Sequence, residues 1–588
     1  MNGFIVGNVK LPDNLPEYSK GCRELNLGSF EVKYIQDKKF QNDKVWEWRG
    51  DTFFLLDGVI LNLSELLKNK SVDSMPELCE KLYYEKGDTF HEEFIGNYAG
   101  LIYEKEKDRL VVFVNKLSSK QVFYYAQNEV FIASVLITDI VETLKQNQIE
   151  YAFNPDAAYL MMNYGYMGTD DTFVKEIKKI EAGHQVVFEK KKVKDDCYHR
   201  FTNNAYDLSK LSEEEIIDGI DERFRKAIDR EYKKDIEGGY KYHYRMLTGG
   251  TDSRACAFVS DNLGYKNVTN FTRGVPEHPD EKISRQIGEY LGNNFIFSSN
   301  LPLQGNASFL KNIDRTIYES QGLAYYLEVA QSSTDSVGID ETTYGLSHGG
   351  SFSEAFLTTG YISEPRMETP TRPLHVYCKL LADKLPSEHL KKYENDDIYS
   401  LYSIFFNKHN PTGRNLVKAD LNSVFPGLDP DLVAYCLSIP IELRKHYYIY
   451  HKWLFTRYPD AAKFKLEKLN ARPIDGPVKK FVGRLYRYGN LRQYFRCSKD
   501  PLPTWLQKKY NLKNKIKPGK QALMPFDWWY DQNPDVDAYM REYLNKNIDN
   551  PVIDDVLRKD ICLVYEKGEA RQKSMALTVV AATKMFFS

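Results

Sequence analysis

The sequence lacks the features that mark several classes of protein. Its eight cysteines are scattered, no two are spaced as CxxC, and no Cys/His spacing is typical of a zinc finger. No run of 18 apolar residues is present, and the N-terminus has no basic segment followed by a long apolar one. We therefore expect a cytoplasmic protein with no membrane span and no disulfide framework.

The sequence also carries almost no net charge. The 588 residues include 80 Lys+Arg and 82 Asp+Glu, which gives a formal net charge of -2. A dedicated nucleic-acid-binding protein is usually strongly basic, so this balance argues against one. The hydrophobic fraction of 42% and the charged fraction of 28% are ordinary for a globular protein, and the length predicts about two to four domains.

The first third of the chain alternates apolar and polar residues over short segments, which predicts a sheet-rich α+β sandwich. The segments are Thr52–Ile60, Ala99–Tyr103, Leu110–Val114, Gln121–Tyr125 and Val130–Ala133. The polar, aperiodic segment Asp195–Ser212 is interpreted as a domain boundary. We therefore expect one domain over residues 1–200 and a second over residues 212–588.

The pattern changes after this boundary. Ser212 followed by three glutamates is typical of a helix start. Strands are then predicted at Tyr242–Leu247 and Val268–Thr272, with helices from about Ser253 and over Asp280–Leu291. Alternating strands and helices predict a parallel α/β sheet. The segment from about Leu374 to Trp453 is predicted to be mainly helical.

A glycine-rich turn between the first of these strands and its helix is the strongest signal. Backbone N–H groups of such a turn, together with the positive end of the helix, favour an anion such as phosphate. The threonine and serine hydroxyls can donate to phosphate oxygens, and the aspartate can hold Mg²⁺. The turn consists of Leu247, Thr248, Gly249, Gly250, Thr251, Asp252 and Ser253. The alternative is a turn that only connects strand to helix.

This turn lacks the Walker A pattern and resembles the SGGxDS pyrophosphate loop of the ATP pyrophosphatase superfamily. Two later segments, Thr272–Gly292 and Phe425–Pro440, are similar to segments of asparagine synthetases. The resemblance implies a nucleotide-binding domain of the adenine nucleotide α-hydrolase type with a helical C-terminal part. It also implies ATP and Mg²⁺ as cofactors, and transfer of AMP to a carboxylate with loss of pyrophosphate.

The first 200 residues resemble the glutamine amidotransferase domain of the N-terminal-nucleophile hydrolase class, which stands in the same place in asparagine synthetases. The matching segments are Met1–Phe4, Leu56–Asn62, Phe94–Ala99, Lys120–Tyr125 and Phe131–Ser134. The combined resemblance covers most of residues 1–475 and keeps the order of both domains. Beyond about residue 480 it ends.

Three departures from this family pattern predict that the first domain is inactive as a glutaminase. Position 2 is Asn2, where the family has the nucleophilic cysteine, and an amide cannot act as that nucleophile. Asp57 and Asn97 replace an asparagine and an aspartate of the family. Loss of this cysteine is typical of β-lactam synthetases and lasso-peptide cyclases, which join a carboxylate to an amine of the same substrate.

A second departure concerns residues 347–351, which overlay the family's GxGSD loop. The overlay implies nucleotide contacts at Gly349 and Gly350 and places His348 where relatives carry an acid/base group. Ser351 replaces a metal-binding aspartate, so Glu354 becomes the second candidate Mg²⁺ ligand beside Asp252. The alternative is that the loop has lost its metal role and that His348 serves only in packing.

Further assignments complete the candidate site. Thr272 is expected to contact the nucleotide. Cations are also expected near the pyrophosphate, because its negative charge must be neutralised as it leaves. The candidate cations are Lys452, Lys468 and Arg472. Glu319 and Glu328 either orient the attacking amine or belong to a solvated helix face. The basic stretch 463–520 is a solvated face, a lid over ATP, or a dock for an acidic peptide or RNA.

These observations predict an AMP-forming carbon–nitrogen ligase. Its expected partners are ATP and a carboxylate-containing small molecule or precursor peptide, with a leader-peptide-binding protein or protease if the chain is a cyclase. One alternative is an ammonia-dependent synthetase acting on an amino acid or sugar acid. An RNA-modifying ATP pyrophosphatase would need a reactive cysteine near the loop, where only Cys256 lies. A non-catalytic binding subunit is the remaining alternative, because of Ser351.

Overall fold

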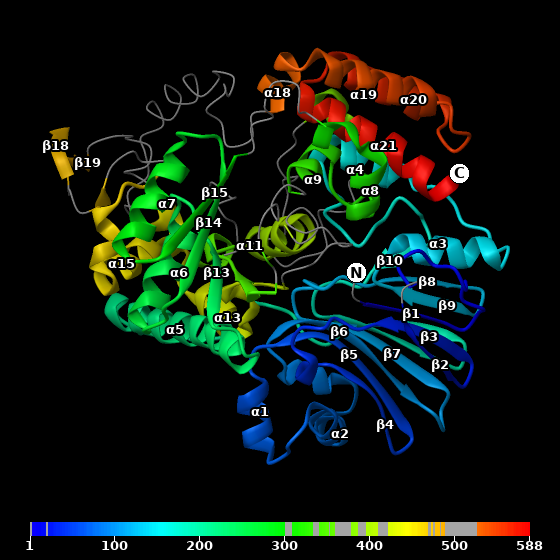
Figure 1. Ribbon diagram of the computed structural model, residues 1–588, viewed down its shortest axis with the longest axis horizontal. Coiled ribbons are helices and arrows are strands. Elements are labelled where there is room, and N and C mark those ends of the chain that lie inside the picture. Colours follow the sequence, from blue (N-terminus) through cyan, green and yellow to red (C-terminus); the bar gives the residue numbers. More distant parts are fainter. Residues whose placement is uncertain are drawn as a thin grey trace.

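The structure is a computed structural model in which two sheet-containing halves lie side by side and a group of C-terminal helices covers one end (Figure 1). It describes residues 3–18, 21–299, 308–332, 340, 342–351, 353–358, 378–385, 395–409, 422–467, 472–473, 477–481, 484–487 and 526–588. Every statement about structure below concerns these residues.

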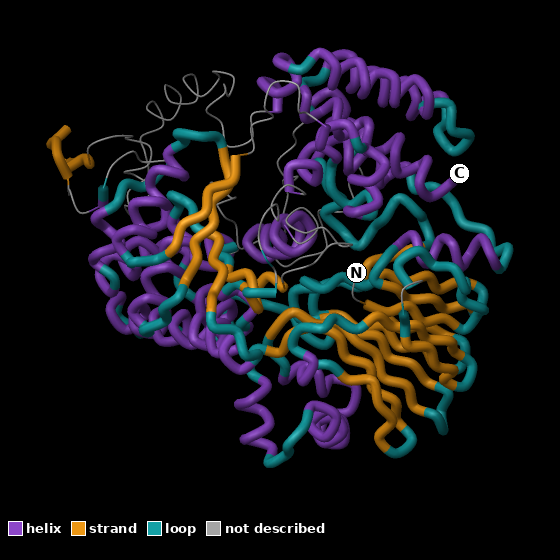
Figure 2. Tube along the Cα trace, in the orientation of Figure 1, coloured by secondary structure: helices purple, strands orange, loops and turns teal. Residues whose placement is uncertain are grey.

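The first half consists of two antiparallel sheets packed face to face (Figure 2). The first sheet has the order β10 (Ile177–Lys179), β8 (Phe123–Gln127), β9 (Val130–Ser134), β1 (Gly3–Gly7), β3 (Phe30–Ile35) and β2 (Arg23–Leu27). The second has the order β12 (Lys192–Cys197), β11 (His184–Glu189), β7 (Arg109–Val114), β6 (Gly96–Glu104), β5 (Thr52–Ile60) and β4 (Val45–Arg49).

Strand β5 shows why the two sheets stack. Phe53 and Leu55 point into the core between the sheets, whereas Phe54 and Leu56 point to the opposite face, as the two-residue period of a strand requires. Helices α1 (Leu63–Lys70) and α2 (Met75–Lys86) cover that opposite face. Helices α3 (Ile137–Gln146) and α4 (Pro155–Tyr164) lie beyond the first sheet.

The sandwich predicted from the sequence is confirmed as two antiparallel sheets with helices outside. The predicted strand over Thr52–Ile60 has the observed bounds. The expected boundary segment began too early, because Asp195 lies in β12 and pairs with Val186 across the sheet. Whether residues 1–200 and 212–588 are separate domains stays a prediction.

The second half contains the predicted parallel sheet. Its order is β15 (Asn294–Ser299), β14 (Val268–Gly274), β13 (Tyr242–Met246), β16 (Tyr344–His348) and β17 (Asn422–Val424), and neighbouring strands are all parallel. No strand was predicted from the sequence for either β16 or β17, whereas the described part of residues 374–453 is mainly helical, as expected. Both are short, and β17 has only three residues.

Three helices pack on one face of the parallel sheet. They are α5 (Glu213–Glu237), α6 (Thr251–Asn262) and α7 (Pro279–Tyr290). The start of α5 confirms the predicted N-cap, since Ser212 and Glu215 form a reciprocal capping box. Arg245 of β13 is buried on this face, where it donates to Asn270 of β14 at 2.7 Å and to Ser260 of α6 at 2.8 Å.

The remaining helices complete the second half and the C-terminal group (Figure 1). Those before residue 470 are α8 (Ile313–Ser320), α9 (Tyr326–Ser332), α10 (Ser353–Leu357), α11 (Asp396–Ser400), α13 (Pro430–Ser438), α14 (Ile441–Arg444) and α15 (Tyr448–Arg457). The C-terminal group is α18 (Phe526–Gln532), α19 (Pro534–Asn547), α20 (Asp555–Lys567) and α21 (Ala570–Phe587). No described helix is long and apolar enough to cross a membrane.

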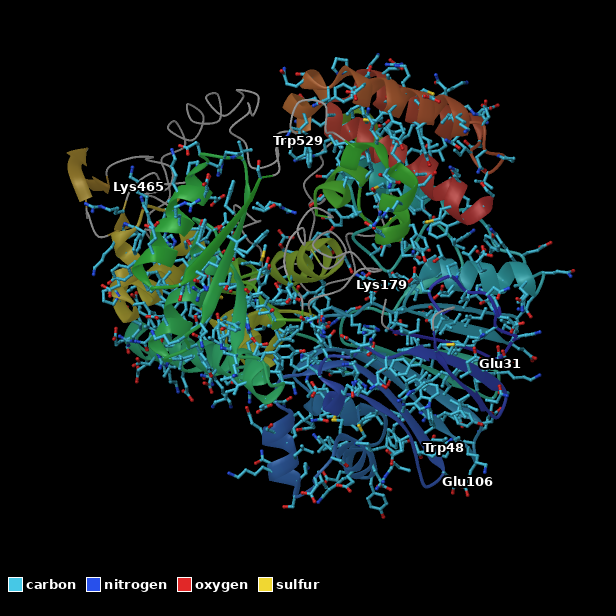
Figure 3. All side chains as sticks on the ribbon, in the orientation of Figure 1. Glu31, Trp48, Glu106, Lys179, Lys465 and Trp529 are labelled. Atoms are coloured by element: carbon cyan, nitrogen blue, oxygen red, sulfur yellow. The ribbon has the colours of Figure 1, made fainter. Side chains whose placement is uncertain are left out.

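Ion pairs of α5 contact both the first half and α13 of the second half. Lys234 contacts Asp43 at 2.5 Å, and both side chains are almost fully buried. Arg230 contacts Glu65 of α1 and Asp429, the N-cap of α13, each at 2.6 Å. Lys179, labelled in Figure 3, comes from the first half and donates to Asn407 of the second. Removing one partner of the buried Lys234–Asp43 pair would leave an uncompensated charge, so this pair fixes α5 against the first half.

Asp139, in the first turn of α3, predicts a pH dependence of stability. Burial raises the pKa of this carboxyl to about 7, although Ser134 donates to it at 2.9 Å. The folded chain therefore holds a proton that the unfolded chain releases, and the free energy of unfolding should fall as pH rises from about 4 to 7.

The variant Asp139→Asn cannot ionise and keeps an acceptor for Ser134. It should be more stable than the wild type at pH 8, by up to roughly 4 kcal/mol, and similar to it at pH 4. Urea-induced unfolding at both values measures this. The exposed Asp156, in the first turn of α4, supplies the control Asp156→Asn, which should behave as wild type. Equal pH slopes for Asp139→Asn and wild type would contradict the assignment.

Candidate active site

The glycine-rich loop lies at the carboxyl end of β13, directly before α6. Strand β13 is the centre of the sheet, with β14 on one side and β16 on the other. The carboxyl ends of parallel strands, near the start of the following helix, are where α/β sheets bind ligands. The loop therefore has the location that the sequence analysis expected for a nucleotide site.

Hydrogen bonds within the second half fix the shape of this loop. The Thr248 N–H donates to Ser253 Oγ at 2.9 Å, and the two hydroxyl oxygens of these residues lie 3.0 Å apart. The Gly249 N–H donates to Asp280 of α7 at 2.7 Å, so in this structure it is not offered to an anion. Thr272 is buried and donates to the Leu247 carbonyl at 2.6 Å, which places it behind the loop as a support.

Arg254, which the sequence analysis did not assign, ties the loop to a distant segment. Its guanidinium is fully buried and donates to the carbonyls of Ala461 and Phe464, each at 3.0 Å, and to that of Lys465. Burial lowers its pKa to about 9. Figure 3 labels Lys465 in this segment. A charged residue directly before the small and apolar residues 255–259 of α6 was the sequence signal that could have revealed this role.

The Asp252 side chain meets the backbone of Glu354 at the start of α6. The Asp252 carboxylate accepts the Tyr450 hydroxyl at 2.8 Å and the backbone N–H of Glu354 at 3.2 Å. Gly350 lies close behind them, because a Cβ there would stand 2.4 Å from the Ser253 nitrogen. Carboxylate oxygens are the ligands that Mg²⁺ prefers, so the Asp252 carboxylate fits the ion that the resemblance implies, whereas the contact of Glu354 with Asp252 is made by its backbone N–H.

The candidate cations have different locations. Lys452 contacts Glu213 of α5 at 2.6 Å, whereas its helix neighbours Tyr450 and His451 face the loop. His451 lies 3.1 Å from the Thr251 hydroxyl. Arg472 is exposed, and Lys468 lies outside the described residues.

His348 is buried at the end of β16 and points toward α5. Its Nε2 lies 2.7 Å from Asp235, and its Nδ1 lies 3.4 Å from Glu231. Burial opposes protonation, but the Asp235 carboxylate prevails and raises the pKa of His348 to about 10. A charged imidazole engaged at both nitrogens cannot accept a proton, so this arrangement favours the packing interpretation over the catalytic base.

The other candidate residues differ in burial. Glu319 is 3% exposed and pairs with Arg315 at 2.9 Å, so it does not belong to a solvated face. Glu328 lies in the first turn of α9. Gly349 donates its N–H to the Val424 carbonyl at 2.8 Å, whereas Ser351 is exposed.

The positions that depart from the glutaminase pattern are engaged in internal contacts. Asp57 is fully buried, forms an ion pair with Lys120 and accepts the Tyr34 hydroxyl at 3.1 Å. Asn97 accepts the Ser119 hydroxyl at 2.8 Å. Asn2 lies outside the described residues. These contacts fix the Asp57 and Asn97 side chains. At position 57, a carboxylate paired with Lys120 stands where the family has a neutral amide.

Comparison with known proteins agrees with the resemblance at the level of the family. Residues 45–199 match the glutamine amidotransferase domain family. A putative glutamine-hydrolysing asparagine synthetase of Methanocaldococcus jannaschii is 26% identical over 261 residues, covering 41% of this chain and 48% of that protein. The chain therefore spans about half the length of this relative. Both findings support an asparagine-synthetase-like family, without separating its β-lactam synthetase and lasso-peptide cyclase branch from other members.

Two solved structures are similar in part. One is described as the allosteric regulatory enzyme of purine biosynthesis, with a TM-score of 0.23, 8% identity, and coverage of 50% of this chain and 74% of that one. The other is the B. subtilis glutamine phosphoribosylpyrophosphate amidotransferase complexed with ADP and GMP. Its TM-score is 0.22 at 9% identity, covering 50% and 59% of the two chains.

Proposed function

We propose that the chain is an ATP-dependent carbon–nitrogen ligase. In this proposal it transfers AMP from ATP to a substrate carboxylate, releases pyrophosphate, and joins the activated carbon to an amine. The observation that carries the proposal is the position of Asp252 at the start of α6, where its carboxylate accepts the backbone N–H of Glu354, beside a loop at the carboxyl end of the central strand. The similarity to an asparagine synthetase supports the same reaction class.

The residues of this site have separable tasks in the proposed reaction. The positive end of α6 and the hydroxyls of Thr248 and Ser253 favour the phosphate groups, while Tyr450 holds the Asp252 carboxylate in one orientation. Mg²⁺ bound by Asp252 and Glu354 would neutralise phosphate charge. Arg254 acts at a distance, because it fixes the loop against residues 461–465.

The candidate enzymes differ in the source of the amine that attacks the activated carboxylate. An inactive glutaminase domain favours an amine carried by the substrate, as in a β-lactam synthetase or a macrolactam-forming peptide cyclase. The Methanocaldococcus jannaschii relative is named a glutamine-hydrolysing asparagine synthetase, and a synthetase of that kind without a working glutaminase would take free ammonia, which is the second candidate. Pyrophosphate release from ATP, measured with candidate carboxylates with and without ammonium, separates these candidates from a binding subunit.

The first half should release no glutamate from glutamine. Asn2 offers no nucleophile, and the Asp57–Lys120 pair places charge where the family has a neutral amide. The single substitution Asn2→Cys should therefore fail to restore activity. A glutamate assay on the wild type and on Asn2→Cys checks both statements, and glutamate formation by the wild type would contradict the proposal of an inactive domain.

A further inference from the structure

A buried cluster of ionisable side chains lies between α5 and the strands β13 and β16, apart from the pair Asp252 and Glu354. His243 comes from β13, His348 ends β16, and Asp235 comes from α5. Their ligand-type atoms lie within 4.8 Å of one another, and no side chain among them is more than 4% exposed. No step of the proposed ligase reaction uses this cluster.

One carboxylate oxygen is the centre of the cluster. Asp235 Oδ2 lies 2.8 Å from His243 Nδ1 and 2.7 Å from His348 Nε2. The other oxygen, Asp235 Oδ1, accepts the backbone N–H of Leu346 at 2.9 Å. The carboxylate is therefore oriented from behind while its second oxygen faces both imidazoles.

Glu231 completes the surroundings of His348. One of its oxygens lies 3.4 Å from His348 Nδ1, the nitrogen that does not face Asp235. Its other oxygen, Oε1, is buried and has no hydrogen-bond partner among the described residues, and Glu231 is 1% exposed. A carboxylate behind a histidine is the usual support of a metal-binding imidazole, because it fixes the ring and raises its basicity.

The donor set and the charges fit a divalent ion. Two imidazoles and one carboxylate are typical ligands of Zn²⁺ and its neighbours in the first transition row. The two carboxylates, Asp235 and Glu231, together balance a charge of two in a buried place. In a tetrahedral site with bonds of about 2.0 Å the ligand atoms stand roughly 3.3 Å apart, so Asp235 would withdraw by about half an ångström.

We propose that Asp235, His243 and His348 bind one divalent transition-metal ion of the zinc type, with Glu231 orienting His348. A water molecule takes the fourth position, and the proton that His348 holds at Nε2 beside Asp235 is released to solvent when the ion binds. The ion links α5 to β13 and β16. It also fixes the position of the end of β16, which directly precedes Gly349 and Gly350. This site is structural and does not depend on the ligase proposal.

The experiment uses the full chain, freed of metal with a chelator and titrated with Zn²⁺ alone or Co²⁺ alone. We expect one equivalent of zinc per chain, a higher Tm when it is bound, and visible Co²⁺ absorption typical of a four-coordinate ion. His243→Gln and His348→Gln should each remove that equivalent. Glu231→Gln should retain it with an affinity about 10–100-fold weaker.

The control variant and the results that would overturn the zinc proposal are independent of the proposed ligase site. Asp252→Asn should bind zinc as tightly as the wild type, because Asp252 is not among the three ligands. Zinc stoichiometry unchanged in both histidine variants would overturn the proposal. If those variants do not fold, the wild type decides alone, since a Tm that does not respond to zinc or to chelator overturns it as well. None of these results would alter the expected pyrophosphate release.

Discussion

Asp252→Asn is expected to lower ATP-dependent pyrophosphate release by about 10²-fold or more. The substitution keeps the size of the side chain and its acceptor for the Tyr450 hydroxyl, but it removes the charge that would hold Mg²⁺ beside the phosphates. An interaction that strengthens as charge develops in the transition state contributes several kcal/mol, which corresponds to this loss of rate.

The same helix provides the control for this prediction. Asp261 lies near the other end of α6 and pairs with Lys266 at 2.9 Å, so Asp261→Asn should leave pyrophosphate release near the wild-type rate. Circular dichroism should show both variants folded. A folded Asp252→Asn variant that turns over normally would contradict the assigned role and favour a loop that only connects strand to helix.

Gly350→Ala is expected to lower the same activity by at least about 10-fold in a folded protein. A Cβ at this position would stand 2.4 Å from the backbone nitrogen of Ser253 and 2.6 Å from the carbonyl carbon of Asp252. Backbone atoms cannot rotate away, so the segment that carries Glu354 must move from the start of α6. Misplacement of catalytic groups by about 1 Å can cost a large factor in rate.

The adjacent glycine supplies a matched control. A Cβ at Gly349 would meet its nearest atom at 3.6 Å, an ordinary contact, and the Gly349 N–H would still donate to Val424. Gly349→Ala should therefore keep most of the pyrophosphate release measured for the wild type. Equal rates for the two alanine variants would show that the close approach of Gly350 to α6 does not matter for activity.

Local sequence patterns predicted the parts of the fold that depend on neighbours in the chain. The period of two over Thr52–Ile60 predicted β5 with its observed bounds, and Ser212 with Glu215 predicted the start of α5. The strand before the glycine loop and the helix after it were predicted in the same way. Strands β16 and β17 were missed because they are short and are specified by partners far away in the sequence.

The candidate site was predicted only in part, because some of its contacts join segments that are distant in the sequence. The loop and Asp252 stand in a local pattern, whereas the contacts of Arg254 with residues 461–465 join segments about 200 positions apart. Lys452 was chosen for its charge, but a helix turns by about 100° per residue, so Tyr450 two positions earlier faces the other way. Tyr450 contacts Asp252, and Lys452 contacts Glu213.

The central claim is tested most directly by identifying which bond of ATP the chain breaks. The chain is supplied with ATP, Mg²⁺, a set of amino acids and other carboxylates, and hydroxylamine to trap an activated carboxyl group. The products are then identified by ³¹P NMR. The account predicts AMP and pyrophosphate together with a hydroxamate, all of them lost in Asp252→Asn. Release of ADP and phosphate would contradict it, and so would a chain that neither binds nor cleaves ATP.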